Sequence, residues 1–126
     1  QARAATDVTG FGLLGHLIEV AEASNLGFSV NFEQIPFMSS TQKFASMFTF
    51  SGGAHNNHFY FSKNVALSTN LTEIQMMLIN DPQTSGGLLI FVDPDKEPDF
   101  LKRTPNLGVS PVLIGEMQRQ KQFLLR

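Results

Sequence analysis

Thr6-Asp7-Val8-Thr9-Gly10-Phe11-Gly12-Leu13-Leu14-Gly15-His16 combines a polar start, three closely spaced glycines and the beginning of an apolar helical pattern. Apolar residues then recur at spacings of three and four, at Leu14, Leu17, Ile18 and Ala21. This periodicity predicts a helix from about Phe11 to Ser24 that buries one stripe. Thr9 is the predicted N-cap, because its hydroxyl can accept a hydrogen bond from a free N–H of the first turn.

The glycines of this stretch need an explanation beyond local stability. Gly10 and Gly12 fall in the predicted first turn, where each glycine costs roughly 1 kcal/mol relative to alanine. One explanation is functional: without side chains, a phosphate or another chain can approach the N–H groups at the helix start. The other is structural, since glycine also permits close packing of a helix against a strand. The stretch matches neither the dinucleotide fingerprint nor the P-loop, so both explanations stay open.

Asp7 has the same two interpretations. A carboxylate just before a helix is stabilised by typically 0.3–1 kcal/mol through the helix dipole. Alternatively, Asp7 could contribute one ligand to a magnesium ion, which is usually held by one or two carboxylates together with substrate phosphates. One carboxylate by itself would bind the metal poorly.

Composition narrows the class of protein. The chain has 126 residues, of which 42% are hydrophobic and 16% charged, as expected for one globular domain. The net charge is -2 and the nine Lys and Arg residues are scattered, so the sequence lacks the basic cluster expected of a nucleic-acid-binding protein. No apolar run approaches the length of a membrane span and no signal-peptide pattern opens the chain, so we expect a cytoplasmic protein. Without cysteine, the chain itself contains neither disulfides nor a thiol nucleophile.

The first half of the chain gives four further predictions. Asn25 or Gly27 should end the helix, because both tolerate left-handed backbone. Phe28 to Phe32 alternates and predicts a half-buried strand. A short helix capped by Ser39 or Ser40 should follow, with its apolar side chains in the core (Phe44, Met47 and Phe48). The polar stretch 51–58 predicts an exposed loop, whose His55 and His58 are weak candidates for a metal site because no acidic or thiolate partner is nearby.

The second half contains another distinctive stretch, Asp81-Pro82-Gln83-Thr84-Ser85-Gly86-Gly87-Leu88-Leu89. A helix with a Thr72–Gln75 capping box precedes it and should end near Asn80. The apolar run 88–92 predicts a strand covered on both faces, and 98–103 a surface helix. The segments 112–117 and 122–125 predict a terminal hairpin. Interspersed helices and strands with uneven connections indicate an α+β fold, with helices packed on a mixed, mostly antiparallel sheet.

The two quoted stretches together resemble the C-terminal domain of the selenophosphate synthetase (selenide, water dikinase) family. Ile35-Pro36, Gly52-Gly53 with Asn57, and Ile114-Gly115-Glu116 also fall in family order, so the resemblance covers essentially the whole chain. The first stretch, in shorter form, is similar to the wider aminoimidazole ribonucleotide synthetase-like superfamily. The resemblance therefore implies the C-terminal domain of that fold, occupying residues 1–126 as a single domain.

The resemblance implies an enzyme that converts ATP, selenide and water into selenophosphate, AMP and phosphate. In this family an N-terminal ATP-binding domain carries the catalytic Cys or selenocysteine and a lysine. Because the chain begins at Gln1 and has its most distinctive motif at the very start, we expect that domain to lie in a longer protein. On this view the 126 residues contain no catalytic nucleophile and are inactive alone, and the full-length protein is a homodimer.

The same resemblance assigns candidate site residues. Asp7 matches the family aspartate that joins N-terminal aspartates in holding magnesium against the ATP phosphates. Thr9, Gly10 and Gly12 would border the phosphate site, with Thr84 and Ser85 near the same interdomain cleft. Two other functions remain open: a related ATP-using synthetase with a different substrate, and a noncatalytic interaction domain that kept the fold.

Overall fold

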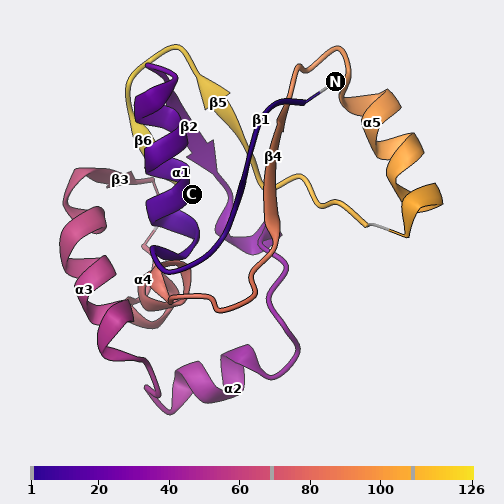
Figure 1. Ribbon diagram of the computed structural model, residues 1–126. Helices are drawn as coiled ribbons and strands as arrows, with labels where there is room; N and C mark the ends of the chain where they lie inside the picture. Colours follow the sequence, from indigo (N-terminus) through magenta and orange to yellow (C-terminus); the bar gives the residue numbers. More distant parts are fainter. Residues whose placement is uncertain (1, 69, 109) are drawn as a thin grey trace.

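The computed structural model describes residues 2–68, 70–108 and 110–126, which form an α+β fold as predicted (Figure 1). The strands are β1 (Ala2–Asp7), β2 (Gly27–Val30), β3 (Val65–Leu67), β4 (Leu88–Val92), β5 (Gly115–Gln118) and β6 (Phe123–Leu125). The α-helices are α1 (Gly12–Ala23), α2 (Thr41–Ser46), α3 (Gly52–Phe61), α4 (Glu73–Asn80) and α5 (Glu97–Arg103). Short 3-10 helices span Phe32–Gln34, Ser62–Asn64 and Thr104–Leu107. None of the described helices combines the length and apolarity needed to cross a membrane.

The described strands form two separate sheets. One is the antiparallel pair β1–β4, which runs as a long ribbon beside the rest of the fold (Figure 1). The other has the order β3-β6-β2-β5, with β2 antiparallel to β5 and parallel to β6, and β3 parallel to β6. The prediction of a mixed sheet is confirmed, and the antiparallel ladders contain more paired residues than the parallel ones.

The predicted terminal hairpin is wrong. Both β5 and β6 pair with β2, which lies between them, so the connection 119–122 crosses over the end of β2. Gly27 permits this crossing, because a Cβ there would collide with the carbonyl oxygens of Gln120 and Gln122. The crossing also explains why the turn lacks a hairpin signal.

Burial of the strands differs from the prediction in two places. All four residues of β2 are buried rather than alternating, and its Phe28 and Val30 belong to the hydrophobic core. In contrast, β4 pairs with β1 alone among the described strands, and its Leu88 and Ile90 are exposed. The prediction that β4 is central and covered on both faces is therefore wrong.

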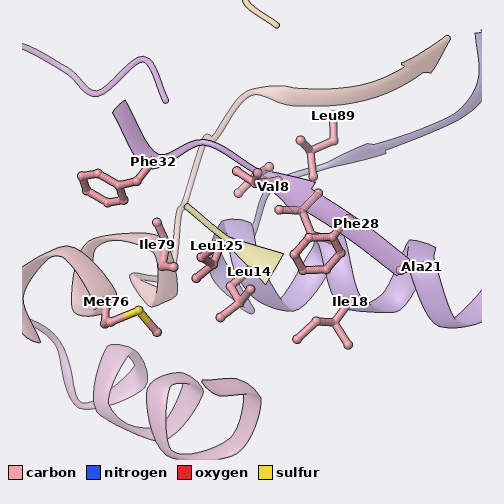
Figure 2. Close-up of a cluster of buried hydrophobic side chains, with 12 residues drawn as sticks. Val8, Leu14, Ile18, Ala21, Phe28, Phe32, Met76, Ile79, Leu89 and Leu125 are labelled. Atoms are coloured by element: carbon pink, nitrogen blue, oxygen red, sulfur yellow. The ribbon is translucent and has the colours of Figure 1, made fainter. Parts of the chain in front are cut away.

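The hydrophobic core lies between α1, α4 and the four-stranded sheet (Figure 2). The predicted apolar stripe of α1 is buried there. Val8 and Leu89 extend the core to the end of the β1–β4 ribbon at which β1 ends and β4 begins. Phe28 stacks on Phe123 of the neighbouring strand with a ring-centroid distance of 5.1 Å. Val8 and Leu89 thus share one core with α1, and the candidate site begins between the ribbon and this helix.

Two local predictions hold. Asn25 ends α1 with a left-handed φ of 58°. Thr72 and Gln75 form the capping box of α4, which ends at Asn80 as predicted. Both features depend on adjacent residues alone, so the sequence predicts them well.

Two predictions in the middle of the chain are wrong. The stretch 51–58 is not a loop but the start of α3, with Ser51 accepting a hydrogen bond from the Ala54 N–H at 3.2 Å. Phe44, Met47 and Phe48 are exposed rather than in the core, because α2 lies at the margin of the molecule (Figure 1). β3 was not predicted, since 59–70 shows little periodicity.

Candidate functional site

Asp7 is the last residue of β1 and pairs with Leu88 of β4. Its side chain is exposed and forms no ion pair or hydrogen bond with another described residue. The next residue is fixed, because the Val8 N–H donates to the Gly87 carbonyl at 2.9 Å. A carboxylate with an anchored backbone and no protein partner is available to a cation.

The two distinctive stretches of the sequence meet directly after Asp7. The Thr9 carbonyl accepts hydrogen bonds from the N–H of Gly12 at 3.1 Å and of Gln83 at 3.0 Å. A Cβ on Gly86 would collide with the Val8 carbonyl oxygen, so the second stretch also lies tightly against the first. We call residues 8–12 the first loop and residues 81–87 the second loop; backbone contacts hold them together.

Gly12 supports the packing explanation for its own position. It is buried with a φ of +68°, and a Cβ would lie 2.8 Å from the carbonyl carbon and 2.9 Å from the oxygen of Asn80. Gly10 differs, because it is exposed and a Cβ there would have no atom within 4 Å. Packing within the described chain thus requires a glycine at position 12 and gives no reason for one at position 10.

The prediction that Thr9 caps α1 is wrong. The cap position is occupied by Phe11, which makes no side-chain cap hydrogen bond. The Thr9 Oγ1 instead lies 3.1 Å from the Nε2 of the buried His16, whose Nδ1 lies 2.9 Å from the Glu19 carboxylate. When Nδ1 donates to the Glu19 carboxylate and Nε2 carries no hydrogen, Nε2 accepts a hydrogen bond from the Thr9 hydroxyl. Residue spacing alone did not suggest this chain of contacts.

The remaining predicted phosphate-site residues lie in the second loop. Thr84 and Ser85 are both exposed, directly after the Gln83 that binds the Thr9 carbonyl. Gln83 also uses its side-chain Nε2 to donate to Asp81, at 3.1 Å to the carbonyl and 3.3 Å to Oδ2. The structure therefore brings the loop that carries Thr84 and Ser85 against the loop that carries Thr9.

Partial burial perturbs the carboxyl group of Asp81 in the second loop. Burial raises the pKa of its carboxyl above the usual value, and the hydrogen bond from Gln83 partly opposes the rise. Desolvation disfavours the charged carboxylate, while a donor favours it. Asp81 thus contributes a partly buried acid at the edge of the second loop.

Asn57 links the first loop to the end of α4, directly before the second loop, and was not predicted as a site residue. Its Nδ2 donates to the carbonyl of Gly10 at 2.9 Å and to the carbonyl of Asn80 at 2.9 Å. The inward position of Asn57 could not be recognised from the sequence, because a stretch rich in Asn, His and Gly is typical of an exposed loop.

The histidines of α3 make local contacts. The His58 Nδ1 lies 2.9 Å from the Ser62 Oγ, and the His55 ring packs near Phe48. In the part of the chain that the structure describes, no three His, Cys, Asp or Glu residues are grouped to hold a metal. A hollow of about 440 Å³ lies elsewhere, lined among others by Phe32, Leu71 and Arg126.

Comparison with known proteins shows the family of the chain. Residues 1–125 match the family described as "AIR synthase related protein, C-terminal domain". The chain belongs to this family. Its relatives include proteins named "Selenide, water dikinase": those of Pseudomonas aeruginosa (38% identical over 124 residues), Sulfurovum sp. (38% over 122) and Carboxydothermus hydrogenoformans (39% over 112).

The match covers most of this chain but only about a third of each relative. It includes 98%, 97% and 89% of this chain, but 35%, 35% and 32% of the respective relatives. The chain thus spans about a third of the length of these relatives. As a C-terminal domain family member, it is similar to one part of those proteins.

Proposed function

We propose that this chain acts as the C-terminal domain of an ATP-dependent selenide, water dikinase. The full-length protein would convert ATP, selenide and water into selenophosphate, AMP and phosphate. One observation carries the proposal: two stretches about 75 residues apart meet at the end of the β1–β4 ribbon, directly after Asp7, whose exposed carboxylate has no partner among the described residues. The similarity to proteins of that name supports the choice of reaction.

Asp7 fits the role of one magnesium ligand. Its carboxylate is exposed and free of described partners, and its backbone is held through Val8 and Leu88. One carboxylate is enough when phosphate oxygens and other ligands complete the site. When bound, magnesium neutralises the charge on the phosphate oxygens during phosphoryl transfer.

The two loops would border the phosphates. Thr9, Gly10, Thr84 and Ser85 lie on loops that backbone hydrogen bonds hold against one another, and three of them are exposed. Gly12 would act by letting the first loop close on Asn80. The exposed Gly10 leaves room for a ligand to approach the backbone beside the start of α1.

The ribbon offers a surface for an N-terminal ATP-binding domain. Asp7 and Ala5 of β1 pair with Leu88 and Ile90 of β4, so all four share one face. Leu88 is 69% and Ile90 38% exposed on this face. Apolar side chains beside a lone carboxylate suit an interdomain surface that completes a metal site. We further propose that the full-length protein is a homodimer, as the resemblance implies, and that it is cytoplasmic.

The first test replaces Asp7 by alanine in the full-length protein. With saturating magnesium and ATP, selenide-dependent AMP formation should fall at least about 100-fold, the scale of losing an electrostatic contact to the transition state. Asp95→Ala is the matched control, because Asp95 is exposed and pairs with its neighbour Lys96 at 3.3 Å. Turnover of Asp7→Ala close to wild type would refute the assignment.

A second test addresses the division of the site. Calorimetric titration of the 126-residue chain with magnesium and ATP should show no tight binding, because Asp7 is a single carboxylate. A submicromolar affinity would show a self-contained site and contradict the proposal.

A related ATP-using synthetase is the second candidate, since the matched family is named after AIR synthase. The two functions differ in their dependence on selenide. ATP consumption by the full-length protein that is independent of selenide, and yields no AMP, would favour this second candidate.

A further inference from the structure

Asn57 is buried on α3, and its one amide group contacts the first loop and the last residue of α4, which directly precedes the second loop. Its two N–H bonds point to the carbonyls of Gly10 and Asn80, each at 2.9 Å. These acceptors also fix the orientation of the amide, because its oxygen could not bond to a carbonyl. The donor capacity of the side chain is therefore fully used by the two partners.

One carbonyl lies within the first loop and the other immediately before the second loop. Gly10 follows Thr9 in the first loop, three residues after Asp7. Asn80 ends α4 and leads directly into the second loop. The Asn80 side chain is itself held by donation to the Met76 carbonyl at 2.8 Å and to the Ser62 Oγ at 3.2 Å.

The helix that carries Asn57 is firmly seated. Ala54, one turn earlier, is fully buried, and Gly53 approaches Pro82 so closely that a Cβ would lie 2.8 Å from its ring Cγ. Phe61, one turn later, packs against Gly15 of α1 and edge-on against Phe11. Asn57 is thus a fixed point between α1 and α4, not an adaptable surface side chain.

We infer that Asn57 is a positioning residue, which sets the separation of the two loops by holding the Gly10 and Asn80 carbonyls at one amide nitrogen. The inference rests on the proposed function, in which Asp7 and Thr9 act with Thr84 and Ser85. These residues are partly or fully exposed, so their side chains depend on the loop backbones for their placement. In phosphoryl transfer most of the acceleration comes from alignment, and a displacement of about 1 Å can cost on the order of 100-fold.

The decisive variant is Asn57→Asp in the full-length protein. It preserves the shape of the side chain, removes both donors and places a carboxylate oxygen against two carbonyls. The kcat for selenide-dependent AMP formation should fall at least about tenfold at saturating substrates. Asn56→Asp makes the same change at an exposed position of the same helix and should retain the wild-type kcat.

Loss of stability must be separated from loss of alignment. Phe28→Leu is a control for stability, because Phe28 of β2 lies in the hydrophobic core and its replacement should destabilise the fold away from the two loops. If Phe28→Leu lowers Tm as much as Asn57→Asp but retains kcat, the loss in Asn57→Asp comes from positioning. An equal loss of kcat in both variants, or a kcat of Asn57→Asp within twofold of wild type, would overturn the inference. If Asn57→Asp does not fold, Asn57→Ser replaces it, because serine removes the amide donors without adding charge.

Hydrogen exchange tests the same link without using activity. Amide exchange in both loops should rise in Asn57→Asp and stay unchanged in Asn56→Asp, whereas unchanged exchange in both loops of Asn57→Asp would overturn the inference. A wild-type protein that forms no AMP from ATP and selenide would instead refute the proposed function. The exchange comparison would then still decide whether Asn57 couples the loops.

Discussion

Replacing Gly12 by alanine should destabilise the fold strongly, whereas the same replacement at Gly10 should not. At Gly12 a side chain must adopt a φ of +68°, which costs a non-glycine residue about 1–2 kcal/mol. Its Cβ would also lie 2.8–3.0 Å from backbone atoms of Asn80 and Ile79, which cannot rotate away. Overpacking of this kind typically costs a further 1–3 kcal/mol or so, giving about 2–5 kcal/mol in total.

The assay is unfolding of the chain by heat and by urea, followed by circular dichroism. For a domain of this size, 1 kcal/mol corresponds to about 4 °C in Tm, so Gly12→Ala should lose roughly 8–20 °C. An unchanged urea m value would show that the change is in stability rather than in the compactness of the unfolded state.

Gly10→Ala is the matched control. Its Cβ would have no atom within 4 Å and its φ is not left-handed, so the free energy of unfolding should change by less than about 0.5 kcal/mol. A loss below about 1 kcal/mol for Gly12→Ala would refute the argument from close approach, as it is smaller than the two costs together. Under the proposed function, Gly10→Ala should still lower ATP turnover, because the methyl group would occupy space for a ligand.

Two further variants test the electrostatics of the loops. Glu19→Gln removes the anionic partner of His16, which in turn contacts Thr9, and should reduce turnover of the full-length protein several-fold by releasing Thr9. Glu22→Gln is the control, because Glu22 is exposed on the same helix, and it should have no effect. Equal activities of the two variants would contradict the role of Glu19 in holding Thr9. Asp81→Asn should raise the stability of the chain relative to wild type as pH increases. Because burial raises the Asp81 pKa on folding, ionisation destabilises the folded state across the interval between the unfolded and folded pKa values. The advantage of the Asn variant should vanish below that interval, and a pH-independent difference in urea unfolding would argue against a desolvated carboxyl.

Local signals in the sequence predicted the helices that bracket the site. The capping box at Thr72 and the left-handed residue Asn25 depend on near neighbours, so they could be identified without the fold. The stripe of α1 was equally clear, because its apolar spacing is regular. These features placed the start of α1 to within one residue and the end of α4 at Asn80.

Pairing of the strands could not be predicted in the same way. The segments that form β5 and β6 look like neighbours, yet β2, about 90 residues earlier, lies between them. Periodicity also says which side chains share a face, but not whether another element covers that face. Leu88 of β4 and Phe44 of α2 were expected to be buried for this reason, and both are exposed.

The candidate site shows the same division between local and distant information. Asp7, Thr9 and the second loop could be selected because their residue types and order are distinctive. Asn57 could not be selected, because the composition of its segment resembles that of an exposed loop. Its partners are backbone carbonyls 23 and 47 positions away in the sequence. Such carbonyls leave no trace in the residue types around them, because every residue carries one. The side chain that hydrogen-bonds to both Gly10 and Asn80 therefore lies in the segment whose composition predicted a loop instead of α3.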